Sequence, residues 1–124
     1  EAHANLDREG LADRVEFIAA EGADGIRMQA KRGARFDFAF IDHSHRAEHV
    51  LSASRELPSV LNAGAAVAYH DFNDFRNLDA AYPGYGVIEG VEAAQEIVSL
   101  TFRGIYGCLG VYQYAADGRG TGGV

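Results

Sequence analysis

The sequence predicts a layered α/β fold with a mostly parallel sheet and an antiparallel hairpin at its edge. Three observations support this: short apolar runs alternate with helix-forming segments, polar clusters follow the apolar runs directly, and two strand-like runs near the carboxyl end flank a tight turn. The 124 residues suit one compact domain. The first residue, Glu1, lies in a stretch that already looks helical, so we expect the chain to be the back part of a longer protein.

The first third of the chain predicts two helices and two strands. Residues 1–10 are rich in helix formers and end at Gly10, which suits a left-handed helix cap. Residues 15–18 are predicted as a short strand, and a short helix is expected from about residue 24 to 30. Residues 36–41 are an apolar run that ends in a polar cluster, as expected for a buried parallel strand.

A helix and a strand come next, before a long loop. Apolar residues at helical spacing follow residue 47, with an interruption at Pro58 and an expected end at residues 62–64. Residues 65–69 are predicted as another buried strand. Residues 71–86 form a polar, turn-rich loop, and loops of this length in a compact domain are often functional.

The remaining residues predict a helix, a hairpin and a tail. A helix is expected at 87–97, and two strands at 100–106 and 109–114 are joined tightly enough for an antiparallel pair. The Gly-rich residues 116–124 are expected to be disordered.

The composition argues against several classes of protein. Eleven Lys and Arg residues against eighteen Asp and Glu residues give a formal net charge of −7, which argues against a nucleic-acid partner or an anionic membrane surface. The single Cys108 cannot form an internal disulfide. No apolar run approaches the roughly 18 residues of a membrane-spanning helix and no signal-peptide pattern opens the chain, so we expect a cytoplasmic protein. The sequence leaves a homo-oligomer open.

Three polar clusters follow the predicted strands directly. They are Glu21-Gly22-Ala23, the segment from Asp42 to His45, and His70-Asp71. Ligands of open α/β sheets bind outside the carboxyl ends of the strands, so these clusters are the candidate site. Two roles are open for Glu21: it accepts hydrogen bonds from a ligand, or it is a solvated loop acid.

Asp42 and Asp71 are the candidate metal ligands. Carboxylates at neighbouring strand ends can hold Mg2+ or another divalent cation, and His45 can add a third ligand. The alternative role for Asp42 is a helix cap, and His43 and His49 also fit ordinary surface positions.

His70 and His45 are the candidate proton acceptors. An imidazole titrates near neutrality, which suits a general base. The alternative for His70 is a partly buried side chain that a neighbouring carboxylate satisfies.

Three segments together resemble class I S-adenosylmethionine-dependent methyltransferases, above all small-molecule O-methyltransferases related to the macrocin and catechol enzymes. They are DRVEFIAAEG, FDFAFIDHSHRAEHVLSASRELPSVLNAGAAVAYHDFND and the closing hairpin, and the similarity spans roughly residues 5–115. The resemblance implies a Rossmann-like three-layer methyltransferase fold that is incomplete here. Residues 1–115 would supply strands three to seven as the carboxyl-terminal part of the domain, without the Gly-rich cofactor loop.

The resemblance also implies roles for the candidate residues. In the family, the loop after strand three borders the adenine of the cofactor, and this loop matches Glu21-Gly22-Ala23. The acid that ends strand four matches Asp42, which would bind the cofactor and the cation. The acid that ends strand five matches Asp71, a metal ligand in metal-dependent members. Catechol-type members follow that acid with Asn, whereas this chain has Phe72, so a third ligand of that type would have to come from His45 or Asn73.

The implied reaction is methyl transfer from the sulfonium of S-adenosylmethionine to the hydroxyl of a small-molecule acceptor. Because the donor is already activated, the enzyme aligns donor and acceptor, and a cation lowers the pKa of the hydroxyl. The Gly-rich loop and the ribose-binding acid are missing from these residues, so we expect the isolated chain to bind S-adenosylmethionine very weakly and to have weak or no activity.

Two alternatives come from other classes. A metal-dependent hydrolase would use a cluster of His43, His45, His49 and Asp71. A non-catalytic domain would keep the fold after its site had decayed. Stoichiometric zinc after purification favours the hydrolase, and magnesium dependence favours the transferase.

Overall fold

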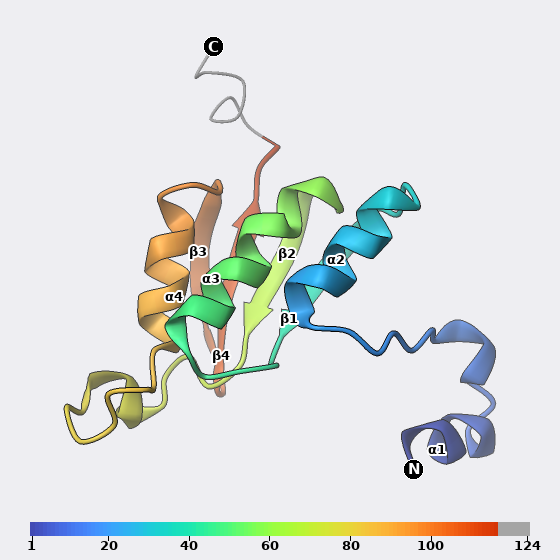
Figure 1. The fold of residues 1–124 in the computed structure, drawn as a ribbon, viewed down its shortest axis with the longest axis horizontal. Helices are drawn as coiled ribbons and strands as arrows, with labels where there is room; N and C mark the ends of the chain where they lie inside the picture. The colour runs from blue at the N-terminus through green and yellow to red at the C-terminus, as the bar shows by residue number, and fades with distance from the viewer. Residues whose placement is uncertain (117–124) are drawn as a thin grey trace.

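The computed structural model describes residues 1–116, and these form a four-stranded sheet with helices on one face (Figure 1). The elements are α1 (Ala2–Arg8), α2 (Gly22–Lys31), β1 (Phe36–Ile41), α3 (Ala47–Glu56), β2 (Leu61–Tyr69), α4 (Val87–Gln95), β3 (Leu100–Tyr106) and β4 (Leu109–Tyr114). Short 3-10 helices lie at Ala12–Arg14, Leu57–Ser59 and Phe75–Leu78. The predicted α/β class and the carboxyl-terminal hairpin are confirmed. Most of the predicted tail, residues 117–124, lies outside the described residues.

The sheet has the strand order β1-β2-β4-β3. β1 and β2 are parallel and are joined through α3, with Phe38 opposite Ala66 and Ile41 opposite Tyr69. β4 is antiparallel to both β2 and β3. Since parallel strands end at the same edge of a sheet, the residues that follow Ile41 and Tyr69 meet there.

The hydrophobic core lies between the sheet and the helices α2, α3 and α4, which all cover one face (Figure 1). Alternate residues of β2 face the helices, as expected for a strand with one covered face. Buried core residues of α3, β2 and α4 include Val50, Ala65, Val67, Tyr69, Val87, Val91 and Ala94. The described residues therefore supply two layers of the predicted three-layer arrangement.

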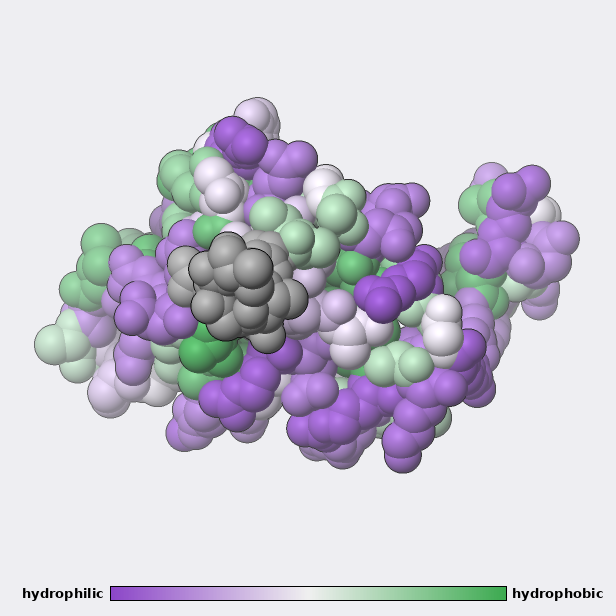
Figure 2. Space-filling view, turned by 90° about the horizontal axis from the view of Figure 1, so that it is seen from above, coloured by the Kyte–Doolittle hydropathy of each residue, from purple (hydrophilic) through white to green (hydrophobic). Residues whose placement is uncertain are grey.

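The predicted strand at residues 15–18 is not formed. This segment has no regular structure and runs away from the sheet to α1, which stands apart from the main body in two views (Figures 1 and 2). Val15 and Phe17 are about half exposed, and the Phe17 ring packs on His3 instead. An isolated strand cannot satisfy its backbone groups, and the described residues provide no partner beside it.

The boundary between α3 and β2 also differs from the prediction. The α-helix ends at Glu56, where Leu57–Ser59 continues as a 3-10 helix containing Pro58. β2 begins at Leu61, opposite Phe36 of β1, so the helix predicted to extend to residues 62–64 is wrong there. The strand pairing outweighs the helical spacing of Val60 and Leu61.

The outer edge of β1 has no neighbouring strand in the described sheet. The side chains of Phe36, Phe38 and Phe40 are 42%, 58% and 50% exposed. A mostly apolar pocket of about 380 Å³ lies between β1 and the start of α2 and includes Ile18 and Ile26. Within the described residues, no helix has the length and apolarity needed to span a membrane.

Candidate functional site

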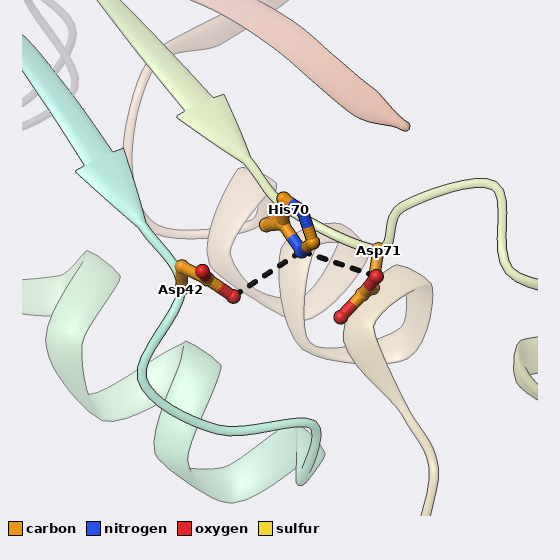
Figure 3. A group of neighbouring side chains, drawn as sticks. All are labelled: Asp42, His70 and Asp71. Carbon is orange, nitrogen blue, oxygen red and sulfur yellow. Dashed lines mark ion pairs between the residues drawn. The ribbon is translucent and has the colours of Figure 1, made fainter. Parts of the chain in front are cut away.

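The ends of β1 and β2 bring three side chains together: Asp42, His70 and Asp71 (Figure 3). The backbone N–H of His70 donates to the carbonyl of Ile41 at 3.0 Å, so the two chains stay paired just beyond the strands. Among the described residues, these three form the one cluster of acidic, His or Cys side chains suited to a metal ion. Their potential ligand atoms all lie within 4.8 Å of one another.

His70 lies between the two carboxylates. Its Nδ1 atom is 3.2 Å from Asp42 Oδ1 and 3.1 Å from Asp71 Oδ1. The atom is buried, yet it makes no well-aligned hydrogen bond to either acid. A nitrogen lone pair and two carboxylates that converge on one small region fit a divalent cation better than they fit a closed hydrogen-bond network.

Asp71 has an unusual backbone conformation, with φ 60°. Asp tolerates this left-handed region better than most residues, and it allows the chain to turn sharply after β2. The side-chain amide of Asn77 fixes the turn by donating to the carbonyls of Asp71 and Phe72 at 3.0 and 3.1 Å. The Phe72 ring packs on Gly110 of β4, where any Cβ would overlap the ring.

The charge of Asp71 is set by its neighbours. Burial alone would raise the pKa of its carboxyl, but the nearby His70 and the hydrogen bond with His45 outweigh this and leave the pKa lowered. His45 Nε2 lies 2.9 Å from Asp71 Oδ2. Asp71 is therefore an ionised carboxylate at neutral pH, available to a cation and to an imidazole N–H.

The loop that follows Asp71 returns to His45. The ring of Tyr85 stacks on the His45 imidazole with centroids 4.6 Å apart and planes 18° apart. The backbone N–H of Gly86 donates to the His45 carbonyl at 2.7 Å. Burial, followed by the nearby Asp71 and Asp74 carboxylates, raises the pKa of Tyr85 to about 12, so its phenol stays neutral and is not a base at ordinary pH.

Glu21, Gly22 and Ala23 lie at the start of α2, beside the loop after β1. A Cβ atom on Gly22 would be 3.0 Å from Cδ2 of His43, so only glycine permits this close approach without displacing the ring. The predicted cofactor segment and the segment from Asp42 to His45 therefore adjoin. His43 covers Gly22 and is not a member of the acidic cluster.

Two other predicted residues are engaged elsewhere. His49 lies on α3 with Nδ1 2.8 Å from Ser44 Oγ, and Asn73 donates to the carbonyl of Gly107 at 2.9 Å. The cluster of His43, His45, His49 and Asp71 that a hydrolase would need is thus not assembled in the described part of the chain. His43 packs on Gly22 and His49 contacts Ser44, so their imidazoles do not join His45 at Asp71.

Comparison with protein families gives a match to a methyltransferase domain over residues 1–72, more than half of the chain. The chain belongs to this methyltransferase-domain family. The match includes the ends of β1 and β2, and with them Asp42, His70 and Asp71. A search of curated proteins found no match.

Solved methyltransferases share the fold. The MycE methyltransferase of the mycinamycin biosynthetic pathway, solved with Mg and SAH, has 18% identity and a TM-score of 0.54 over 81% of this chain. An O-methyltransferase family protein from Burkholderia thailandensis has 16% identity and a TM-score of 0.57 over 94% of this chain. The chain spans 32% and 40% of the lengths of these two proteins.

Proposed function

We propose that this chain is the cation- and acceptor-binding part of an S-adenosylmethionine-dependent O-methyltransferase acting on small-molecule hydroxyl groups. The observation that carries the proposal is the convergence of Asp42, His70 and Asp71 at the carboxyl edge of the sheet, with His45 bonded to Asp71. Membership of the methyltransferase-domain family supports the reaction, and the MycE complex with Mg and SAH supports the choice of cofactors.

Asp42, Asp71 and His70 are the residues that would hold a divalent cation such as Mg2+. Such a cation would lower the pKa of the acceptor hydroxyl. The predicted ligand His45 takes a different part in this proposal, because its Nε2 atom is bonded to Asp71 and lies beside the acidic cluster rather than within it.

His45 is the proposed proton acceptor. If its Nε2–H donates to Asp71, the lone pair of the neutral imidazole lies on Nδ1 and can accept the hydroxyl proton. The side chain is 49% exposed, so an acceptor can reach it. His70 is less suited to proton transfer because its Nδ1 atom is buried between the two acids.

Glu21, Gly22, Ala23 and Asp42 are proposed to border the cofactor. They lie beside one another at the same edge of the sheet, through the contact of Gly22 with His43. In the complete enzyme, a further strand would pair with the open edge of β1 and cover the pocket of about 380 Å³. The apolar lining and the exposed phenylalanines of β1 support this.

The cation site is tested by Mn2+ binding to the 124-residue chain, followed by electron paramagnetic resonance. Replacing a ligand should weaken binding by more than about tenfold in Asp71→Asn and Asp42→Asn. Asp37→Asn is the matched control, since Asp37 lies on β1 outside the cluster and accepts a hydrogen bond from Asn62. Equal Mn2+ affinity in Asp71→Asn and the control would refute the cation site.

The reaction is tested in the longest reading frame that contains these residues. Methyl transfer from labelled S-adenosylmethionine to a panel of small hydroxyl compounds should require Asp71 and respond to added Mg2+. Calorimetric titration of the 124-residue chain alone should show very weak binding of S-adenosylmethionine. Micromolar affinity there would contradict the proposed division between cofactor and cation parts.

A further inference from the structure

The Tyr85 ring contacts two planar groups. Its ring stacks on the His45 imidazole, and the Arg76 guanidinium carbon lies over the ring, 4.5 Å from its centroid. The Tyr85 hydroxyl is buried near the Asp74 carboxylate without a well-aligned hydrogen bond to it. The contacts of Tyr85 with His45 and Arg76 are therefore made by its ring.

The loop that carries Tyr85 is fixed at several points. Asp74 holds Arg76 through three hydrogen bonds of 2.8 to 3.0 Å, one from the backbone N–H and two from the guanidinium. The Asn77 side chain joins the two ends of the loop by donating to the Asp71 carbonyl and accepting from the N–H of Ile88 at 3.0 Å. These hydrogen bonds therefore fix the position of the Tyr85 ring that packs on His45.

His45 has few other restraints. It lies in the irregular segment between β1 and α3 and is half exposed, so its side chain would otherwise sample several rotamers. Its only hydrogen bond among the described side chains is to Asp71. The stacked Tyr85 ring removes most of the alternative orientations of an imidazole that stays half exposed.

We infer that Tyr85 is a positioning residue that holds the His45 imidazole in the orientation in which Nε2 bonds to Asp71. The inference rests on the proposed role of His45 in proton transfer. The ring of Tyr85 performs this function without its hydroxyl. Phe at this position should therefore replace Tyr, and an aliphatic residue should not.

The stack is tested by nuclear magnetic resonance of the 124-residue chain. Its five His residues allow the His45 resonances to be assigned with a His45→Gln variant. The Tyr85 ring current should move the His45 ring protons upfield, with cross-relaxation between the two rings. Tyr85→Leu should abolish the shift and Tyr85→Phe should preserve it. Absence of cross-relaxation in the unsubstituted chain would overturn the inference even if Tyr85→Leu did not fold.

Tyr82→Leu is the matched control. Tyr82 is in the same loop, but its ring contacts Phe75 and not His45. An equal change of the His45 resonances in Tyr82→Leu would show that general loosening of the loop, not the stack, is responsible, and would overturn the inference.

Mn2+ affinity gives a second readout. Replacing a residue that orients a metal ligand commonly weakens metal binding by about 10- to 100-fold. Tyr85 contacts His45, which in turn bonds to the proposed ligand Asp71, so its effect should be smaller. Tyr85→Leu should therefore weaken Mn2+ binding about three- to tenfold. Tyr85→Phe and Tyr82→Leu should stay within about twofold of the unsubstituted chain. If that chain binds no Mn2+, the proposed cation site fails, and the resonance data alone decide the role of Tyr85.

Discussion

The hydrogen bond between Ser54 and Tyr69 should determine much of the stability around the site. Ser54 Oγ of α3 and the Tyr69 hydroxyl at the end of β2 are 2.8 Å apart, and both residues are fully buried. Tyr69 directly precedes His70 and Asp71, so this bond ties the helix layer to the strand that positions the acids. We expect a double-mutant cycle over Ser54→Ala and Tyr69→Phe to show strong coupling.

The magnitudes follow from what each change leaves behind. Ser54→Ala leaves a buried phenol without a partner, which costs about 1–3 kcal/mol, although Ala offsets roughly 0.5 kcal/mol through its higher helix propensity. Tyr69→Phe should cost less, about 0.5–1.5 kcal/mol, because a helical Ser hydroxyl can turn to the carbonyl four residues earlier. The double variant should lose about 1 kcal/mol less than the sum of the single losses.

The same pair predicts an alkaline transition. Burial, only partly opposed by the Ser54 hydrogen bond, raises the pKa of Tyr69 from 10.0 to about 12. The folded chain therefore holds this proton more tightly than the unfolded chain. The resulting stabilisation, roughly 3 kcal/mol, is complete below pH 10 and is lost as the pH rises through about 12. Tyr112 contributes in the same direction, since burial raises its pKa to about 12 as well.

Urea unfolding followed by far-ultraviolet circular dichroism, from pH 7 to pH 12, measures both effects. Tyr69→Phe should flatten the decline in the free energy of unfolding above pH 10. Tyr106→Phe is the control, because Tyr106 is 61% exposed and should change neither quantity. Purely additive single losses, or an alkaline decline unchanged by Tyr69→Phe, would refute this account of the buried pair.

Two further predictions concern packing and the open edge. Gly90→Ala should destabilise the chain by about 1–3 kcal/mol, since its Cβ would lie 2.7 Å from Val50 Cβ and separate α4 from α3. Gly25→Ala in α2 should instead raise the free energy of unfolding by up to about 1 kcal/mol, because the nearest atom to the added Cβ is 3.8 Å away. Equal urea midpoints for the Gly90→Ala and Gly25→Ala variants would contradict this. Phe38→Ser at the open edge of β1 should reduce self-association of the isolated chain in sedimentation velocity. Phe75→Ser, which changes an exposed loop residue, should not, and an equal effect of both would argue against edge pairing.

The sequence predicted the elements whose pattern is local. The strand at 36–41 and both strands of the hairpin have the predicted bounds, because their apolar runs end at polar or Gly-containing turns. The strand at 15–18 failed for a non-local reason: a strand needs a neighbour, and apolar composition alone does not provide one. The start of β2 was missed because pairing with β1 outweighs a helical pattern.

The candidate site was predicted in outline by a topological rule. Strand order places Asp42 and Asp71 at one edge, and no side-chain detail is needed for that. The place of His70 between them depends on its rotamer, and the contact of Tyr85 with His45 depends on how a sixteen-residue loop folds back. The length of the loop indicated a functional segment, but the positions of its aromatic residues in the sequence did not distinguish Tyr85 from the others.

The described residues separate the two tasks that the proposed enzyme would combine, which are cation binding and cofactor binding. The acidic cluster depends on β1, β2 and the loop after β2, all of which this chain contains and packs against its own helices. Cofactor binding, in contrast, is proposed to need a neighbour beside the exposed edge of β1. Because the first task depends on contacts already formed, cation binding should survive in the isolated chain even where S-adenosylmethionine binding does not. Absence of both cation and S-adenosylmethionine binding in the isolated chain would refute the proposed cation site.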